Sequence, residues 1–240
     1  MRYLVEVSFD GSNYVGFQRQ LNGNAIENEI EKAFKNMTKI PTKIYSSGRT
    51  DKGVHAKALT FHFDSDLEIT LENWVNGLNK RLPLDIRVNK IKVVKASFHA
   101  RYSAKARIYQ YYISKKPNTP FNQRYEVYIE GFDYNKALET LNYFIGKKDF
   151  RGFSKAPKDK DTIKEIYEFT LKETKNHYIF TIKGSSFLRY MVRSIIGTII
   201  EIATNRKDIS VINEIFKTHN RKLAGKSAEA RGLYLKRVIY

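Results

Sequence analysis

The sequence predicts an α+β protein built from two ferredoxin-like (split βαβ) halves, which form one extended, mostly antiparallel sheet with a central cleft. Three observations lead to this prediction. The chain has 240 residues, enough for one large domain or two small ones, and its 42% apolar content disfavours disorder. Segments with an apolar period of two alternate with segments of helical period. The element order β-α-β-β-α-β occurs twice, although no sequence repeat is visible.

The first half, predicted as residues 1–95, should contain four strands and two helices. Alternation of apolar and polar residues indicates the strands, as in Val5 beside Glu6, and apolar residues four apart indicate the helices, as in Ile26 and Ile30. In chain order the elements are a strand at 2–9, a helix opened by Asn24, strands near 43–46 and 57–64, a helix capped by Thr70 that stops before Pro83, and a strand at 86–94.

The second half, predicted as residues 96–240, repeats this order and should complete the active-site cleft. In chain order its elements are a strand at 106–114, a helix capped by Asp133 and ended by Gly146, strands near 162–172 and 177–184, an apolar helix at 187–203, a shorter helix from Asp208 and a closing strand at 233–240. The candidate catalytic loop described below falls in the first half.

The chain is strongly basic, with 43 Lys and Arg residues against 25 Asp and Glu, a formal charge of +18. This excess favours a polyanionic partner, either nucleic acid or an anionic membrane. Membrane is the weaker candidate, because the N-terminus has no uninterrupted apolar core and the most apolar stretch, 186–203, contains Arg189 and Arg193. We therefore expect a nucleic-acid partner and no membrane association.

Cysteine is absent from the sequence. This excludes disulfides, thiolate nucleophiles and cysteine-based metal sites, and it fits a reducing, cytoplasmic location. The histidines show no metal-ligand spacing, so no metal site is expected.

The connector "YSSGRTDKGVHA" (45–56) contains charged residues that a simple turn does not require. Asp51 followed by Gly53 is ordinary turn chemistry, which is one interpretation of the aspartate. Arg49 favours a functional interpretation, because an exposed charge pair contributes only about 0–1 kcal/mol to stability. His55 is better interpreted as structural than as catalytic.

The apolar helix at 187–203 presents a second anomaly. Its residues are apolar nearly all round, so the helix should be buried, and Arg189 and Arg193 should share a face. A buried guanidinium needs a partner. A structural salt bridge or a side chain that reaches solvent from the helix start would explain Arg189. Arg193, two turns into the predicted helix, needs an internal carboxylate, and Asp51 is one candidate.

The strand "RIYQYYIS" (107–114) places Tyr109 and Tyr111 on one face and Tyr112 on the other. Tyrosines on a strand usually serve core packing. In a strongly basic protein, an aromatic ring in a cleft can also stack on a nucleobase. The sequence leaves both interpretations of these tyrosines open.

Five motifs, in order, resemble the A-type tRNA pseudouridine synthases (the TruA family), and the resemblance covers almost the whole chain. The loop motif is specific on its own, and the others add to it. The motifs are "FDGSNYVGFQRQ" (9–20), "GRTDKGVH" (48–55), "SFHARYSAKARIYQYYI" (97–113), "FLRYMVRSIIG" (187–197) and "GLYLKRVIY" (232–240).

The resemblance implies the pseudouridine synthase fold and a role for four residues. Asp51 matches the catalytic aspartate, and Arg193 matches the arginine that pairs with it. Arg49 matches the arginine that helps displace the target nucleotide from the helix stack, and Tyr109 matches the tyrosine that stacks on the target uracil. The sequence departs from the family pattern in three places, which are Glu27, Lys164 and Glu229.

The resemblance also implies a substrate and an assembly. It implies that the protein is a homodimer that isomerises uridine to pseudouridine at positions 38–40 of the tRNA anticodon stem-loop. The reaction involves no redox change and no gain or loss of a group, so it requires no cofactor and no metal. The carboxylate can attack the sugar C1′ or the base C6, or take a proton from C2′. Each route needs an ionised aspartate, which a paired guanidinium favours.

Two alternatives to this function stay open. A non-catalytic RNA-binding protein explains the charge and the tyrosines, but it does not explain Asp51 near Arg49 or an arginine in an apolar helix. A pseudouridine synthase that acts on another RNA site would carry the same motifs.

Overall fold

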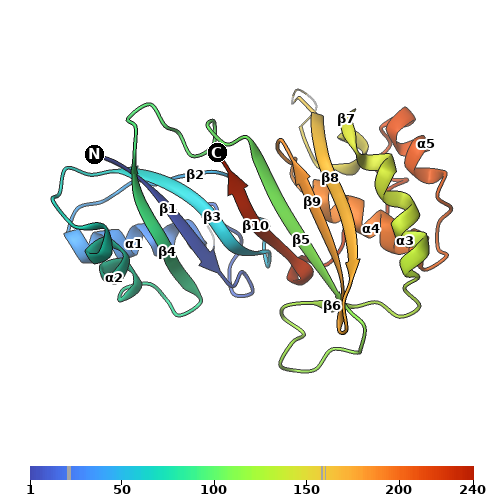
Figure 1. Cartoon of the computed structure of the whole chain (residues 1–240), viewed down its shortest axis with the longest axis horizontal. Coiled ribbons are helices and arrows are strands. Elements are labelled where there is room, and N and C mark those ends of the chain that lie inside the picture. Colours follow the sequence, from blue (N-terminus) through green and yellow to red (C-terminus); the bar gives the residue numbers. More distant parts are fainter. Residues whose placement is uncertain (21–22, 158, 160) are drawn as a thin grey trace. The chain divides into compact units, whose positions relative to one another are not determined.

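The structure is a computed structural model, and it describes residues 1–20, 23–157, 159 and 161–240. The chain forms two compact units (Figure 1). The first unit contains Met1–Lys105 and Tyr234–Tyr240, and the second contains Ala106–Leu233. The α+β class and the mostly antiparallel strand pairing that the sequence predicts are confirmed.

The first unit has the predicted βαββαβ order. Its elements are β1 (Arg2–Phe9), α1 (Ile26–Thr38), β2 (Tyr45–Ser46), β3 (His55–Asp64), α2 (Leu71–Asn79) and β4 (Ile86–Val94), followed at the end of the chain by β10 (Leu233–Ile239). The strands lie in the order β4-β1-β3-β10, and the short β2 also pairs with β3. All these pairs are antiparallel except that of β10 with β3, which is parallel.

The division between the units differs from the predicted boundary at residue 95, and the reason is the closing strand. In β10, Tyr234 pairs with His55 of β3. The backbone N–H of Lys105 donates to the carbonyl of Ile239 at 2.8 Å. These contacts hold both the end of the chain and residues 96–105 in the first unit, although the sequence pattern assigns them to the second half.

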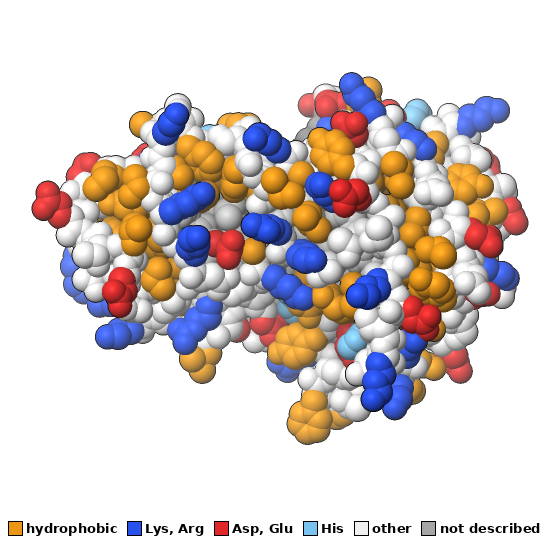
Figure 2. Space-filling view, in the orientation of Figure 1, with side chains coloured by type: hydrophobic (Ala, Val, Ile, Leu, Met, Phe, Trp, Pro, Cys, Tyr) orange, Lys and Arg blue, Asp and Glu red, His pale blue; other side chains and the backbone are white. Residues whose placement is uncertain are grey.

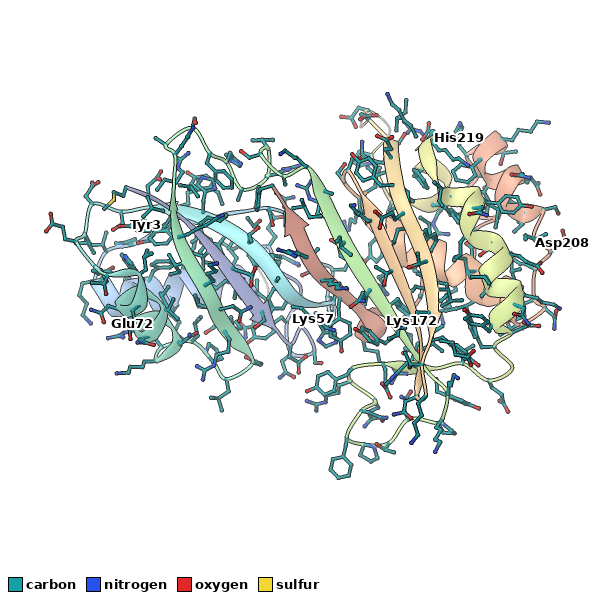
Figure 3. The ribbon with its side chains drawn as sticks, viewed as in Figure 1. Tyr3, Lys57, Glu72, Lys172, Asp208 and His219 are labelled. Atoms are coloured by element: carbon teal, nitrogen blue, oxygen red, sulfur yellow. The ribbon has the colours of Figure 1, made fainter. Side chains whose placement is uncertain are left out.

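The core of the first unit is an aromatic cluster between the sheet and its two helices. Phe34 of α1 and Trp74 of α2 both pack against Phe63 of β3, with ring centroids 4.6 and 5.2 Å away. Tyr3 of β1, labelled in Figure 3, stacks on Phe63 at 5.0 Å. Because Phe34 and Trp74 meet the same ring, α1 and α2 cover the same face of the sheet.

The second unit contains more elements than the sequence predicts. They are β5 (Ala106–Ser114), β6 (Val127–Tyr128), α3 (Tyr134–Thr140), β7 (Gly146–Asp149), β8 (Ile163–Glu173), β9 (His177–Gly184), α4 (Met191–Ala203) and α5 (Val211–Thr218), with 3₁₀ turns at Leu141–Phe144, Arg151–Phe153 and Ala230–Gly232. The strands β5-β9-β8-β7 are antiparallel neighbours, and β6 pairs in parallel with β5. The sequence analysis missed the short strands β6 and β7.

Two of the predicted helix caps are confirmed and three predicted helix starts are wrong. Thr70 Oγ1 accepts a hydrogen bond from Asn73 N at 3.2 Å, and Asp133 Oδ1 accepts one from Lys136 N at 3.1 Å. Helix α1 begins after Ala25 instead of Asn24, and α5 begins at Val211 instead of Asp208. Helix α4 begins at Met191 instead of 187.

The late start of α4 has a backbone cause. Tyr190 has a φ of 62°, in the left-handed region, where a helix cannot continue. Arg189 therefore lies outside the helix and is exposed, and Arg193 lies in the first turn instead of two turns in. The prediction that the two arginines share a helical face is wrong for this reason.

Helix α4 is buried nearly all round, as predicted. The segment 224–228 covers it closely, because a Cβ on Gly197 would lie 1.9 Å from the carbonyl oxygen of Lys226. Figure 1 shows α3, α4 and α5 gathered beside the strands β8 and β9. Among the described residues, the helices are all too short or too polar to cross a membrane.

Candidate active site

The loop that carries Asp51 joins β2 to β3, and the chain after β1 braces it. Asp51 forms an isolated antiparallel bridge with Gly16, and Phe17 N donates to Thr50 O at 3.2 Å. A Cβ on Gly11 would lie 2.1 Å from the carbonyl oxygen of Val54. The motifs at 9–20 and 48–55 therefore form one backbone assembly, and the half-buried Asp51 sits on it.

Asp51 also begins the turn that the sequence predicts. Val54 N donates to Asp51 O at 3.1 Å, and Gly53 at the third position has a φ of 75°. Glycine adopts this conformation without the steric cost that other residues meet. The turn returns the chain to β3 directly after the carboxylate.

His55 is structural, as the sequence suggests. Its ring is 1% exposed and stacks on Tyr234 of β10 at 4.6 Å. Nδ1 lies 3.1 Å from both Gly11 N and Asp10 Oδ1. The histidine thus ties the loop after β1 to β3, and Lys57, labelled in Figure 3, lies 5.3 Å from the same Tyr234 ring.

Arg49 is exposed, and no hydrogen bond or ion pair joins it to another residue within the described ranges. Its guanidinium is therefore available to a ligand. The same loop thus presents a half-buried carboxylate and, two residues earlier, a solvated cation.

Glu27 is one of the departures from the family pattern. It fixes the end of the segment 9–20, which braces the Asp51 loop. Its carboxylate accepts a hydrogen bond from Arg19 N at 2.7 Å, while the Arg19 side chain pairs with Glu31. The other two departures make ion pairs in the second unit, Lys164 with Asp161 and Glu229 with Arg231, each at 2.8 Å.

In the second unit, Tyr109 and Tyr111 share a strand face, as predicted, and this face packs against helices. They pair with Ile182 and Phe180 of β9, which are both 1% exposed. Tyr111 is also 1% exposed, whereas Tyr109 is half-buried and meets the Phe187 ring edge-on at 5.2 Å. Tyr109 is therefore the more accessible ring on this face.

Tyr112 lies on the other strand face, where its hydroxyl donates to Gln110 Oε1 at 2.9 Å. Gln110 in turn donates to Thr181 Oγ1 at 3.2 Å. This polar arrangement marks the open face of the sheet, because the helices cover the opposite face.

Arg193 is fixed by the segment that covers α4. Its Nε donates to Ala228 O at 2.7 Å, and Ala228 N donates to the Arg193 carbonyl at 2.8 Å. Arg221 secures the same segment, since its Nη2 donates to Ser194 Oγ and to Ser227 Oγ, each at 3.0 Å. The sequence analysis missed Arg221, because it lies in a segment without apolar periodicity and its partners are distant along the chain.

Three cations surround the ring of Tyr190, immediately before α4. Arg189 and Arg193 each lie 5.2 Å from the ring centroid, and Lys155 lies 4.9 Å from it. These charges lie at the N-terminal end of the helix, where anions are stabilised. This is the type of site at which a phosphate group binds.

The predicted site residues therefore fall in two sets. Asp51 and Arg49 share one loop of the first unit, and Tyr109 and Arg193 lie in the second unit. The ion pair between Asp51 and Arg193 stays a prediction. The described residues contain no group of three or more His, Asp or Glu side chains that could hold a metal ion.

Comparison with known families accounts for these features. The motifs, the α+β fold and the basic composition are those of an RNA-modifying enzyme. A model of the family described as tRNA pseudouridine synthase matches residues 6–103 and 141–240. The chain belongs to this family, and the resemblance that the motifs indicate is confirmed.

Curated relatives align with this chain over almost its full length. The chain is 39% identical over 239 residues to a tRNA pseudouridine synthase A from Phytoplasma mali, an alignment that covers 99% of this chain and 98% of the relative. It is 36% identical to the protein of the same name from Aster yellows witches'-broom phytoplasma, with coverage of 99% and 98%. It is 34% identical to the one from Staphylococcus aureus (strain bovine RF122), with coverage of 99% and 90%.

Proposed function

We propose that the protein isomerises uridine to pseudouridine at positions 38–40 in the anticodon stem-loop of tRNA, with Asp51 as the reacting group. The observation that carries the proposal is the braced loop, in which backbone contacts to Gly11 and Gly16 hold a half-buried carboxylate at one position. Family membership over nearly the whole chain supports the reaction type.

The reaction exchanges one bond for another within the nucleotide. The C1′–N1 bond breaks, the uracil turns, a C5–C1′ bond forms, and the proton on C5 is replaced by one on N1. Asp51 can take part as a nucleophile at C1′ or C6, or as a base at C2′. No cofactor enters any of these routes.

The family resemblance assigns proposed roles to three other residues. The target base must leave its stack, which costs a few kcal/mol. Arg49 is exposed, so it can occupy the space that the base leaves and pair with a phosphate. Tyr109 is the accessible ring that stacks on the extruded uracil. Arg193 pairs with Asp51 and favours its charged form.

The protein's charge supports a large RNA contact. Figure 2 shows Lys and Arg side chains distributed over the visible face, and the net charge is +18. We propose that the protein acts in the cytoplasm as a homodimer, with one tRNA in contact with both subunits. Sedimentation of the active protein at micromolar concentration should give a dimer, and an active monomer would refute this assembly.

Mapping pseudouridine in tRNA after incubation with the purified protein tests the function. The expected result is new pseudouridine at positions 38, 39 or 40. New pseudouridine only at other positions would mean that the enzyme modifies a different site in the RNA. Binding without any new pseudouridine would instead indicate a non-catalytic RNA-binding protein.

A further inference from the structure

Four aromatic rings form a continuous cluster in the first unit. We call it the aromatic platform, and it consists of Tyr45, His62, His99 and Tyr102. Tyr45 stacks on His62 with centroids 4.9 Å apart and an interplanar angle of 17°. His99 meets His62 at 4.7 Å and Tyr102 at 4.4 Å. Residues from β2, β3 and the segment after β4 thus present one aromatic surface.

The platform is buried at its centre and open at both ends. His62 is only 2% exposed, whereas Tyr45 is 40% exposed and Tyr102 is 77% exposed. Tyr102 is thus the outermost ring of the platform and lies mostly in solvent. With 77% of Tyr102 exposed, its ring is accessible to a partner.

Two cations lie at the ends of the platform. Lys43 lies 5.2 Å from the Tyr45 ring centroid, and the Arg101 guanidinium lies 5.8 Å from that of Tyr102. The nearby carboxylate of Asp64 is neutralised by Arg2, which donates to both its oxygens at 2.8 Å. A groove beside the platform, about 710 Å³ in volume, is lined by Lys92, Val93, Val94, Lys95, Ser97, Phe98 and Ser103.

The segment that carries His99 and Tyr102 is held in place. Arg2 Nη1 donates to Ala96 O at 2.6 Å and to Phe98 O at 2.7 Å. Ala100 N donates to His62 Nδ1 at 3.2 Å. Because these bonds fix the backbone, the rings are pre-organised, and a ligand that stacks on them loses little free energy in ordering the site.

The surroundings of both histidines favour the uncharged form at neutral pH. Burial, together with the nearby His99 and Arg2, lowers the pKa of His62 to about 4. Burial also lowers the pKa of His99, with Arg2 and Arg101 as additional causes. The middle of the platform is therefore neutral and aromatic, while Lys43 and Arg101 supply charge at its edges.

We propose that the aromatic platform is a second RNA-binding site, which stacks an unpaired base of the tRNA other than the uridine that is isomerised. Aromatic rings bordered by Lys and Arg are the surface that single-stranded nucleic acid requires, because every base has a π-face and every nucleotide a phosphate. The proposal rests on the proposed function for its choice of tRNA as the RNA.

Equilibrium binding of an unmodified tRNA transcript to the full chain, repeated over a range of salt concentrations, tests the proposal. Tyr102→Ala should weaken binding about 5- to 150-fold, the range for loss of one stacked base. The slope of log K against log salt should not change, because no phosphate contact is lost. Tyr102→Phe keeps the ring and should bind like the unaltered protein.

Two further variants separate stacking from charge. Arg101→Gln should reduce the salt slope by about 0.7–0.9, the effect of one lost phosphate contact. Phe121→Ala is the matched control, since Phe121 is an aromatic residue of the second unit that is 91% exposed. Phe121→Ala should leave tRNA affinity unchanged. Equal affinities for Tyr102→Ala and Phe121→Ala would overturn the proposal.

Photocrosslinking gives an independent readout. A tRNA that contains 4-thiouridine, irradiated on the protein and digested, should yield adducts on peptides with Tyr45 or Tyr102. If Tyr102→Ala changes the sedimentation of the free protein and not the tRNA affinity, the platform is a contact between copies and the proposal is wrong. If the unaltered protein binds tRNA but forms no pseudouridine, the proposed function fails. The comparison of tRNA affinity between Tyr102→Ala and Phe121→Ala still tests the platform in that case.

Discussion

Substitution of Gly11 by alanine tests whether the braced loop positions the catalytic carboxylate. A Cβ on Gly11 would lie 2.1 Å from the carbonyl oxygen of Val54, whereas ordinary van der Waals contact begins near 3.4 Å. The obstructing atom is backbone, so no side chain can rotate away. The segment that contains Gly11 and the one that contains Asp51 and Val54 must move apart by roughly 1 Å to relieve the contact.

A displacement of this size should affect catalysis more than folding. A misplacement of about 1 Å can cost on the order of 100-fold in rate, because the reacting groups must be aligned. Overpacking of this kind typically costs about 1–3 kcal/mol of unfolding free energy, which a domain of this size survives. We therefore expect Gly11→Ala to be folded, to bind tRNA and to lose about two orders of magnitude in kcat.

The assay is single-turnover pseudouridine formation at saturating tRNA, together with thermal unfolding. Gly77→Ala is a suitable control, because its Cβ would meet only the flexible side chain of Met37, and alanine is favoured over glycine inside a helix. Gly77→Ala should retain full activity. A Gly11→Ala protein with normal single-turnover rate would show that the loop's position is not set by this contact.

The remaining predictions concern the second unit, the charge and the buried histidine. Tyr109→Leu should abolish turnover and keep the fold. Tyr112→Leu, on the open face of the sheet, should change the unfolding free energy by no more than about 1 kcal/mol. Turnover and melting temperature of both variants check these two predictions. Arg193→Met and Asp51→Asn should show a coupling energy of about 0.5–3 kcal/mol in a double-mutant cycle of stability, and a value near zero would mean that the two side chains do not meet. Affinity for tRNA should fall steeply with salt, by a slope of about −0.7 to −0.9 for each phosphate contact, and a flat response would argue against a role for the +18 charge in RNA binding. Because burial lowers the pKa of His62 to about 4, the unfolded chain takes up its proton first as pH falls below about 6.5. Stability should therefore decrease between pH 6.5 and 4, by up to about 1.4 kcal/mol per pH unit from this residue, and His62→Gln should flatten that slope.

Local chemistry explains why much of the fold could be predicted from the sequence. Thr70 and Asp133 cap their helices by bonds to residues three positions ahead, so the signal is contained in a short window. Strand alternation is equally local, and β1, β4 and β5 have the predicted bounds. The motif around Asp51 also lies within one short segment.

The features that the sequence could not predict depend on distant contacts. The left-handed conformation of Tyr190, which delays α4, has no signal in the residue itself, because tyrosine rarely adopts it. The place of β10 depends on its pairing with His55, far earlier in the chain. The role of Arg221 depends on Ser194 and Ser227. Apolar periodicity carries no information about such contacts.

The central claim is that Asp51 is the reacting group and not a contact that holds the tRNA. The most direct measurement is pseudouridine formation by Asp51→Asn, which removes the charge with almost no change in shape, alongside its affinity for tRNA. We predict no detectable pseudouridine at positions 38–40 and a tRNA affinity close to that of the unaltered protein. Substantial pseudouridine formation by Asp51→Asn would contradict the catalytic assignment.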